Sequence, residues 1–485
     1  MATRAIRIRW QHLSRTGTRQ KDKFEALSSC YYINMKHAVG IFLVAVLFIT
    51  GCGGSGTKKR ESEVPGLPSL KPGPIITVAT GSDDLAPDLR YPPAVALLGV
   101  SPEAKTTGDT IIVWTTGKTL QGAMYSGSTT KLSSMTLTST PESDRLHLAP
   151  SVVAEKDGTF TVIWDNGNIV GQKFGGDGNP LGTLEVFSKT GAEPDVVLGK
   201  DGKIFISYIG NDRKIHLITK TKNQEKKDIV VGEDLTGKVG DKDKQLYFLP
   251  NIGVDDAGNI LVVWQETPEA RGSMAEAPNG YPNFATRIDP AGKVAEKDIR
   301  IDKAPPSRIG DFPAVFGLSS GWAVAWKDTN ANEKTFGDGS GLRKDATELM
   351  KQVDSKLMLT FYNAKGEPTS PSVRVDTSGK VFTSPGIIQM ENISQRTWRA
   401  ALPGMARDRS GNIFVAWTDY RSGKPEVYGR LVNGTATQMG PEMKLGDGLN
   451  PQMSFDGKGF QAIWEAATVT PPLKAIYLRD LAIEP

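Results

Sequence analysis

Cysteine and histidine are scarce in this chain of 485 residues, which holds two cysteines, Cys30 and Cys52, and four histidines. Two cysteines allow one disulfide at most, so a disulfide-stapled fold is excluded. His147 and His216 are the only histidines after residue 52. This scarcity argues against histidine-ligated zinc and against a histidine-based nucleophile relay. No glycine-rich phosphate-binding motif precedes a helix and no calcium loop is complete, so we expect no cofactor and no metal.

Long apolar runs are also missing, apart from one near the N-terminus. "MKHAVGIFLVAVLFITGC" starts at Met35 and holds thirteen uncharged residues between Ala38 and Thr50. A bilayer span needs ~20 such residues, whereas a shorter run suits the core of a secretory signal. Ile49-Thr50-Gly51-Cys52 resembles the lipobox of bacterial lipoproteins. The resemblance implies that Cys52 is lipidated and becomes the first mature residue, with translation starting at Met35.

Removal of residues 1–51 changes the charge of the chain. The whole sequence has a net charge of +4, but residues 52–485 hold 50 basic and 52 acidic side chains, a net charge of −2. A near-neutral surface gives no electrostatic basis for binding nucleic acid. Residues 52–88 are rich in Gly, Ser, Lys and Pro and are expected to form a flexible tether. Because Gly53 is not an aspartate-type retention signal, we expect an outer-membrane lipoprotein of the cell envelope, held to the membrane by its N-terminal lipid.

Beyond the tether, one pattern repeats. "DRSGNIFVAWTDYRSGKPEVYGRL" (408–431) joins a tight turn, an apolar run ending in tryptophan, a polar bend and a second run. Related stretches include "DDAGNILVVWQE" from Asp255 and "EKDGTFTVIWDN" from Glu155. The seven aromatic anchors are Trp114, Trp164, Tyr208, Trp264, Trp326, Trp417 and Trp464. Each follows a proline, in order Pro93, Pro150, Pro194, Pro250, Pro313, Pro403 and Pro451.

Each copy reads as four short strands. The apolar runs suit strands buried on both faces, and Asp-Gly or Ser-Gly pairs before them are hairpin turns. Four antiparallel strands in about 50 residues, repeated seven times, predict an all-β, seven-bladed β-propeller over residues 89–485. The anchors are expected to pack between blades. Since the last copy ends early, the run over 74–80 is expected to supply the strand that completes the seventh blade.

Long insertions follow the anchors or lie between copies, at residues 268–284, 332–357 and 381–401. In a propeller both kinds of loop emerge on one face, so we expect that face to carry a binding surface. The blade-five insertion is expected to contain a short helix. Asp345 and Glu348 form a capping-box pattern, and Leu349, Val353 and Leu357 would share one face.

Acidic residues follow the anchors within two positions. Seven-fold geometry would bring five of them to one channel mouth, where they could bind a cation or a polar ligand or have perturbed pKa values. The other interpretation is that these residues only start bends after the second strands. Tyr420 and Arg421 could add stacking and anion contacts. The acids are Asp165, Glu266, Asp328, Asp419 and Glu465.

Over residues 92–481 the repeat resembles those of bacterial secreted propellers and, more loosely, the sialidase superfamily. Sialidase repeats carry a Ser-x-Asp-x-Gly-x-x-Trp box, whereas Asp408, Gly411 and Trp417 stand further apart here. The resemblance therefore implies a fold and carries no catalytic residue. Our main interpretation is a lipid-anchored binding or scaffold module for an envelope protein or glycan. The alternative is a glycan-active hydrolase or lyase that uses the carboxylates at the mouth.

Overall fold

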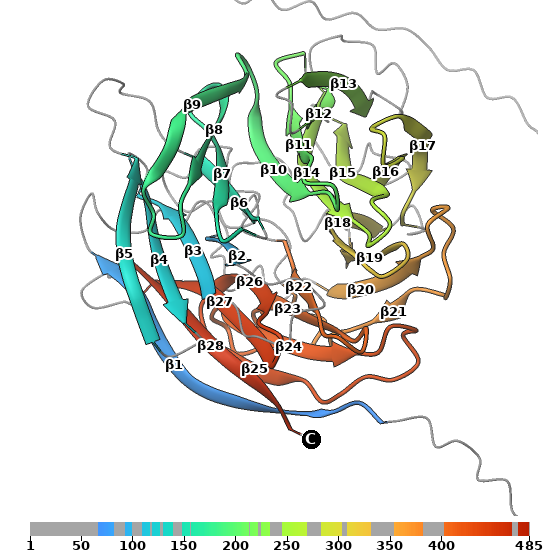
Figure 1. Cartoon of the computed structure of the whole chain (residues 1–485). Coiled ribbons are helices and arrows are strands. Elements are labelled where there is room, and N and C mark those ends of the chain that lie inside the picture. Colours follow the sequence, from blue (N-terminus) through green and yellow to red (C-terminus); the bar gives the residue numbers. More distant parts are fainter. Residues whose placement is uncertain are drawn as a thin grey trace, which may run out of the picture. The chain divides into compact units, whose positions relative to one another are not determined.

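The computed structural model describes residues 66–81, 93–98, 109–116, 119–126, 130–138, 148–155, 157–212, 214–221, 225–232, 245–268, 283–302, 308–330, 354–381, 402–467 and 474–484. These residues form seven four-stranded antiparallel sheets that follow one another around a central axis (Figure 1). The chain is therefore a seven-bladed β-propeller, as the repeats predict. Within the described residues no helix is long and apolar enough to cross a membrane.

The blades follow the sequence in order, and each runs from its innermost to its outermost strand. Blade one comprises β2 (Ala94–Leu98), β3 (Asp109–Thr115), β4 (Leu120–Ser126) and β5 (Thr130–Thr138). Blade two comprises β6 (Leu148–Ala154), β7 (Phe160–Asp165), β8 (Ile169–Phe174) and β9 (Pro180–Ser188). Blade three comprises β10 (Ala192–Leu198), β11 (Ile204–Ile209), β12 (Ile215–Lys220) and β13 (Lys226–Gly232).

The same order holds in the rest of the ring. Blade four comprises β14 (Gln245–Val254), β15 (Ile260–Pro268), β16 (Asn283–Ile288) and β17 (Val294–Arg300). Blade five comprises β18 (Arg308–Gly317), β19 (Trp322–Asn330), β20 (Ser355–Tyr362) and β21 (Val373–Arg374). Blade six comprises β22 (Gly404–Arg407), β23 (Ile413–Asp419), β24 (Glu426–Val432) and β25 (Met443–Asp447).

Blade seven joins the two ends of the described chain. Its strands are β26 (Leu449–Phe455), β27 (Gly459–Ala467), β28 (Lys474–Glu484) and, outermost, β1 (Ser69–Gly81). The strand expected over 74–80 thus lies inside a longer strand that pairs antiparallel with β28 from Ser69↔Glu484 to Gly81↔Lys474. This pairing closes the ring by hydrogen bonds between the two ends of the described chain and covers the outer edge of β28.

The helix expected in the blade-five insertion falls largely outside the described residues. Asp345, Glu348, Leu349 and Val353 lie there, as do most of the three insertions. Leu357, however, belongs to β20 and is fully buried, so assigning it to the helix was wrong. Its spacing from Val353 fits one helix face, but Leu357 packs inside a sheet between blades five and six.

Each aromatic anchor packs against the preceding blade. Trp417 of blade six lies in one cluster with Ala323, Ala325, Leu357 and Leu359 of blade five. Trp464 likewise packs on blade six, Trp264 on blade three, and Trp114 on blade seven. Tyr208 fills the same place against blade two. The seven core clusters are therefore seven interfaces between blades, and the prediction that the anchors pack between blades is confirmed.

The recurrent spacing of turn and proline also has a structural reason. Gly258 and Gly411 close the turns between first and second strands with φ of 90° and 86°, a backbone region that other L-residues avoid. In five blades the innermost strand has an irregular register around its proline, for instance between Leu449 and Gln452 in blade seven. Proline lacks the N–H that a regular ladder needs, so a bulge accommodates it.

Replacing Trp417 by alanine should open a cavity between blades five and six. Trp417 is fully buried, and such truncations cost about 3–5 kcal/mol of unfolding free energy. Chemical denaturation checks this value, and Trp417→Phe, which keeps much of the ring volume, should lose clearly less. A Trp417→Ala protein as stable as the parent would contradict the role of the anchors.

Removing β1 should destabilise the ring. Deletion of residues 69–81 exposes the edge of β28 and the cluster around Val78, which is 4% exposed. We expect Tm to fall by about 5 °C or more, at roughly 2 °C per kcal/mol for a large domain. Deletion of residues 53–65 is the matched control and should leave Tm unchanged. An equal Tm for both deletions would show that closure does not depend on this strand.

Candidate functional site

The predicted acids occupy the far ends of the second strands. Asp165 ends β7, Asp419 ends β23 and Glu465 lies in β27; their exposures are 3%, 0% and 0%. Asp328 lies half-buried in β19, and Glu266 lies in β15 opposite Tyr247 in the strand register. The shared position along the second strand is as expected. The ligand-binding role of these five acids stays a prediction.

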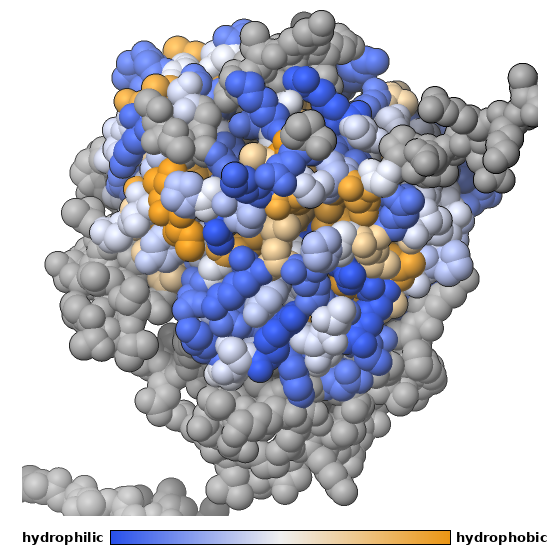
Figure 2. Space-filling view, turned by 90° about the horizontal axis from the view of Figure 1, so that it is seen from below, coloured by the Kyte–Doolittle hydropathy of each residue, from blue (hydrophilic) through white to orange (hydrophobic). Residues whose placement is uncertain are grey.

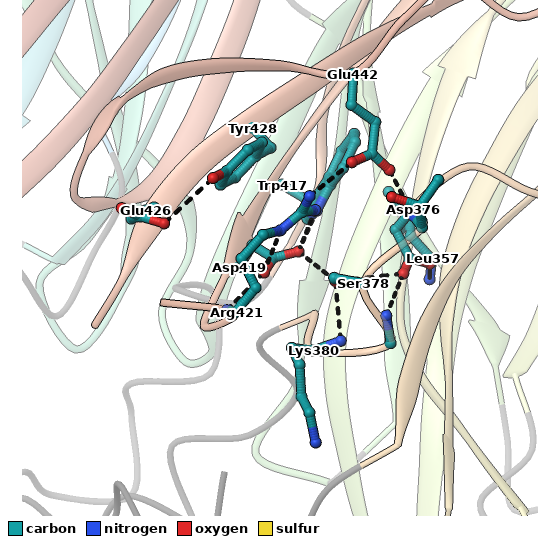
Figure 3. Close-up of polar contacts among 12 residues, drawn as sticks. Leu357, Asp376, Ser378, Lys380, Trp417, Asp419, Arg421, Glu426, Tyr428 and Glu442 are labelled. Carbon is teal, nitrogen blue, oxygen red and sulfur yellow. Dashed lines mark hydrogen bonds and ion pairs between the residues drawn. The ribbon is translucent and has the colours of Figure 1, made fainter. Parts of the chain in front are cut away.

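Asp419 makes a full set of internal contacts (Figure 3). Its Oδ2 accepts hydrogen bonds from Ser378 Oγ at 2.6 Å, Trp417 Nε1 at 3.1 Å and Arg421 Nη2 at 2.9 Å. Its Oδ1 accepts from the backbone N and the Nε of Arg421. Burial alone would raise the pKa of Asp419, but these hydrogen bonds outweigh it and hold the pKa below its ordinary value. Asp419 is thus a charged clasp between blades five and six.

Arg421 binds two carboxylates and stacks on an aromatic ring, but all three partners are side chains of the protein itself. It contacts Asp419 and, through Nη1, Glu442 Oε2 at 2.8 Å. Its guanidinium lies 4.0 Å from the centre of the Tyr428 ring (Figure 3). Tyr420 donates its backbone N–H to Lys380 O, and burial raises the pKa of its hydroxyl. The Tyr420 hydrogen bond ties blade six to the segment that follows β21.

The other buried acids serve the local backbone. Asp165 Oδ1 accepts the N–H of Gly167 at 2.6 Å, which shapes the bend after β7. Glu465 Oε2 accepts a hydrogen bond from Asn450 Nδ2 at 2.7 Å, which links the first two strands of blade seven. Asp165 therefore serves the bend after its strand, as the second interpretation of the sequence holds, although its side chain is buried rather than solvated.

A second cluster surrounds His216 on blade three. His216 Nδ1 lies 3.2 Å from Asp228 Oδ1 and Nε2 lies 3.0 Å from Asp212 Oδ1. Tyr208 donates its hydroxyl to Asp228 Oδ2 at 2.6 Å. With a carboxylate facing each ring nitrogen, the doubly protonated imidazolium is favoured. The hydrogen bond to Asp228, followed by that to Asp212, raises the pKa of His216 even though burial opposes it.

One cavity lies on the propeller axis, at the opposite end from the acids. Its volume is about 730 Å³, and it is lined by innermost strands of blades one, three, four, five, six and seven. It also reaches turns between first and second strands, at Asp256, Ser319 and Arg409. Because the second strands run from these turns to the acids, over six to seven residues at ~3.3 Å each, about 20 Å separates the two groups. We call this cavity the central pocket.

One ion pair spans the central pocket. Arg407, which ends β22 in blade six, donates through Nη2 to Asp256 of blade four, at 2.9 Å from Oδ1 and 3.0 Å from Oδ2. Blade five lies between them in the ring, and its residue at the corresponding place is Gly317, where an added Cβ would meet the backbone of Val254 in blade four. Nη1 of Arg407 is buried and has no hydrogen-bond partner among the described residues.

Sequence reasoning missed this ion pair because its partners stand 151 residues apart. A signal was present nonetheless. At the place of Arg407, five of the six other copies have an apolar residue or glycine, and the structural register identifies these as Ala154, Leu198, Val254, Gly317 and Phe455. The fold does not require a charged residue at a repeat position where five other copies have apolar residues or glycine.

Asp480 of β28 has a clearly perturbed pKa but does not line the pocket. Burial and the nearby charge of Asp456 raise the pKa of Asp480 to about 6, and a hydrogen bond from Gln461 opposes them. Within the described residues no group of three His, Cys, Asp or Glu side chains could hold a metal ion.

The structure is thus a propeller with a pocket on its axis. Comparisons with known proteins show similarity of the fold alone. No family model and no curated protein matches the chain. Among solved structures, an ulvan lyase from a new family of polysaccharide lyases is 9% identical, covering 81% of this chain and 95% of its own, with a TM-score of 0.47.

Two other solved structures are similar at the same level. An α-L-arabinanase of Penicillium chrysogenum in complex with arabinobiose is 10% identical, covering 84% of this chain and 98% of its own, with a TM-score of 0.42. A protein of unknown function from Dyadobacter fermentans is 11% identical, covering 84% and 99%, with a TM-score of 0.43. Similarity at this level concerns the fold and does not bear on activity.

The His216 cluster predicts a pH-dependent contribution to stability. Because the folded pKa of His216 is raised, its stabilisation is complete below the unfolded pKa, ~6.5, and is lost as pH rises through the folded pKa. His216→Gln should therefore lower the unfolding free energy more at pH 6 than at pH 9, as urea denaturation at the two pH values can measure. A loss that is equal at both, or larger at pH 9, would refute the imidazolium clasp.

Proposed function

We propose that this protein is a glycan-directed β-propeller that holds a sugar chain in its central pocket, with a preference for acidic sugars. The observation that carries the proposal is the Arg407–Asp256 pair, which crosses the pocket from blade six to blade four. Neither residue is needed for a turn or a strand there, and the other repeat copies do without the arginine. A polar pair held over a cavity of this kind suits ligand recognition.

The size and lining of the pocket support a sugar as its ligand. A volume of about 730 Å³ falls within the ~300–1,000 Å³ typical of small-ligand sites. Phe316 and Phe455, both half-buried, contribute aromatic surface to the wall. Sugar rings present apolar C–H faces to such surfaces and hydroxyl groups to charged donors and acceptors. Arg407 and Asp256 supply one of each.

The charge of the pocket supports an acidic sugar in particular. Arg407 and Arg409 line it together with Asp256 and Asp408. Asp408, however, is 5% exposed, and its two oxygens accept the backbone N and Nδ2 of Asn412 at 2.8 Å each. The Arg407–Asp256 pair is thus the charged pair that crosses the pocket. Arginine forks bind carboxylates and sulfates well, so Arg407 fits a uronate or a sulfated sugar.

A second candidate function is cleavage of the bound glycan. A hydrolase needs two carboxyl groups roughly 5–10 Å apart across the scissile bond, and Asp408 is committed to its turn. Elimination from a uronate fits the lining better. Arg407 would neutralise the sugar carboxylate, and Asp256 would take the proton from C5. The C4–O bond would break with its electron pair leaving on the glycosidic oxygen, which takes a proton from water, and a C4=C5 double bond would form.

We further propose that the propeller works at the cell envelope. The lipobox-like Ile49-Thr50-Gly51-Cys52 supports lipidation of Cys52, and the tether after it supports attachment to a membrane. A protein held there meets the polysaccharides of the cell surface and its surroundings. A protein partner bound by the insertion loops is the other reading of the sequence, and those loops lie outside the described residues.

The test is a comparison of pocket variants in glycan binding. We expect Arg407→Gln to weaken binding of a polyuronate about 10-fold or more, because a hydrogen bond to a charged group contributes ~1.5–3 kcal/mol. Lys365→Gln removes one positive charge from an exposed turn of blade five and should leave the affinity unchanged. Calorimetric titration with polyuronate, sulfated and neutral glycans gives the values.

The outcomes separate the candidates. Equal affinity of the Arg407→Gln and parental proteins for every glycan bound would refute the central pocket as the site. Appearance of the ultraviolet absorbance of an unsaturated uronate, abolished in Asp256→Asn while binding remains, would establish elimination. Binding without that absorbance and without new reducing ends would leave the protein as a glycan-binding module.

A further inference from the structure

The exposed apolar side chains of this propeller gather on one arc of its rim. The large hydrophobic residues that are most exposed among those described are Ile75, Leu132, Leu181, Leu184 and Val186, at 44–49%. All of them lie on outermost strands, namely β1, β5 and β9, which belong to blades seven, one and two. These three blades are consecutive in the ring. Described outer strands of the other four blades hold no residue of this kind.

The part of this arc on β1 holds further apolar side chains. Ile75 is 48% exposed, and Leu67, Leu70 and Ile76 are half-buried and pack against the cores on either side of blade seven. Figure 2 views the side on which β1 and β28 lie in Figure 1, and it shows apolar residues in a band bordered above and below by hydrophilic ones. An apolar band of this kind marks a contact surface rather than scattered exposure. We call the surface formed by β1 and β5 the apolar rim.

The backbone of β1 is unsuited to pairing with another strand. Pro72 and Pro74 are both exposed and cannot donate to a ladder, and the register with β28 shifts between Pro72 and Ile75 and again after Thr77. Prolines and bulges on an edge strand prevent edge-to-edge association. A partner of the apolar rim is therefore held by side-chain contact and not by an added strand. A lipid surface makes contact in that way.

Chain length places the same surface next to the proposed anchor. Thirteen residues separate Cys52 from Gly66, where the described chain begins. At ~3.5 Å per extended residue, they span roughly 50 Å at most, whereas a compact ring of this size is about 55 Å across. The tether also holds Lys58, Lys59 and Arg60, and Lys71 is exposed on β1. Basic side chains beside a lipid chain favour an anionic membrane surface.

We propose that the apolar rim lies against the headgroup region of the membrane that holds Cys52, so that the propeller stands on its edge. The inference rests on lipidation of Cys52, itself a proposal, and is independent of glycan binding. Ile75 and Leu132 enter the interface beside the basic side chains. The propeller axis then runs parallel to the membrane plane, so neither end of the axis faces the membrane.

Introduced cysteines test this orientation. The full-length lipoprotein is expected to have no free thiol, because Cys30 is removed with the signal and Cys52 is acylated. Ile75→Cys and Leu132→Cys place a label on the apolar rim, and Ala295→Cys places one on the exposed strand β17 of blade four. Each variant carries an environment-sensitive fluorophore and is reconstituted in vesicles of phosphatidylethanolamine and phosphatidylglycerol. Equal Tm values confirm that the labelled proteins are folded.

We expect emission at positions 75 and 132 to be at least about twofold stronger and shifted to the blue relative to position 295, with less quenching by iodide, since the label enters the interface. Equal emission and quenching at all three positions would overturn the inference. Oxidative cross-linking of Ile75→Cys into dimers, with its label still quenched by iodide, would overturn it in favour of a second copy. Labelling of the parent protein itself would reveal a free Cys52 and thus overturn the anchor on which the inference depends.

Discussion

The packing of one aromatic ring against the preceding blade is the interaction on which this structure depends. Each blade is a sheet with two apolar faces, and neither face can be covered from within the blade. A tryptophan or tyrosine from the second strand fills the wedge between two sheets, seven times around the ring. Buried aromatic rings contribute large apolar areas, so the ring behaves as a cyclic array of interfaces. The central pocket and the apolar rim are surfaces that the packing between blades does not cover.

The fold could be predicted from the sequence because its determinants are local. The Gly turns, the apolar runs and the anchors sit within a dozen residues of one another, and they fix two strands at a time. The irregular register in the innermost strands could not be predicted, although the prolines that accompany it are plain in the sequence. Proline alone does not reveal whether a strand ends or bulges, since that depends on the partner strand. Leu357 shows the same limit. Its spacing from Val353 fits a helix, but Leu357 lies in a strand and is buried between two blades.

The candidate site was harder to predict because its contacts join distant parts of the chain. Asp419 stands out for its place after the anchor, but Ser378, which contacts it from another blade, stands 41 residues away. Arg-x-Asp pairs after the fourth strands, in "RID" at 300–302 and "RVD" at 374–376, hold similar buried carboxylates. Most buried acids here thus stabilise the joints between strands or blades. Arg407, whose partner Asp256 lies two blades away, stands out only when the copies are compared through the structure.

The strand that closes the ring has a consequence for how the protein is made. Ser69 Oγ contacts Glu484 across a sequence separation of 415 residues, so the N-terminal strand has no partner until the last strand has been delivered. Under the proposed export the chain crosses the membrane from its N-terminus, and the ring then cannot close until translocation is complete. Contacts of such long range slow folding. For that interval β1 and the growing blades present open edges, and the prolines of β1 protect the edge that waits longest.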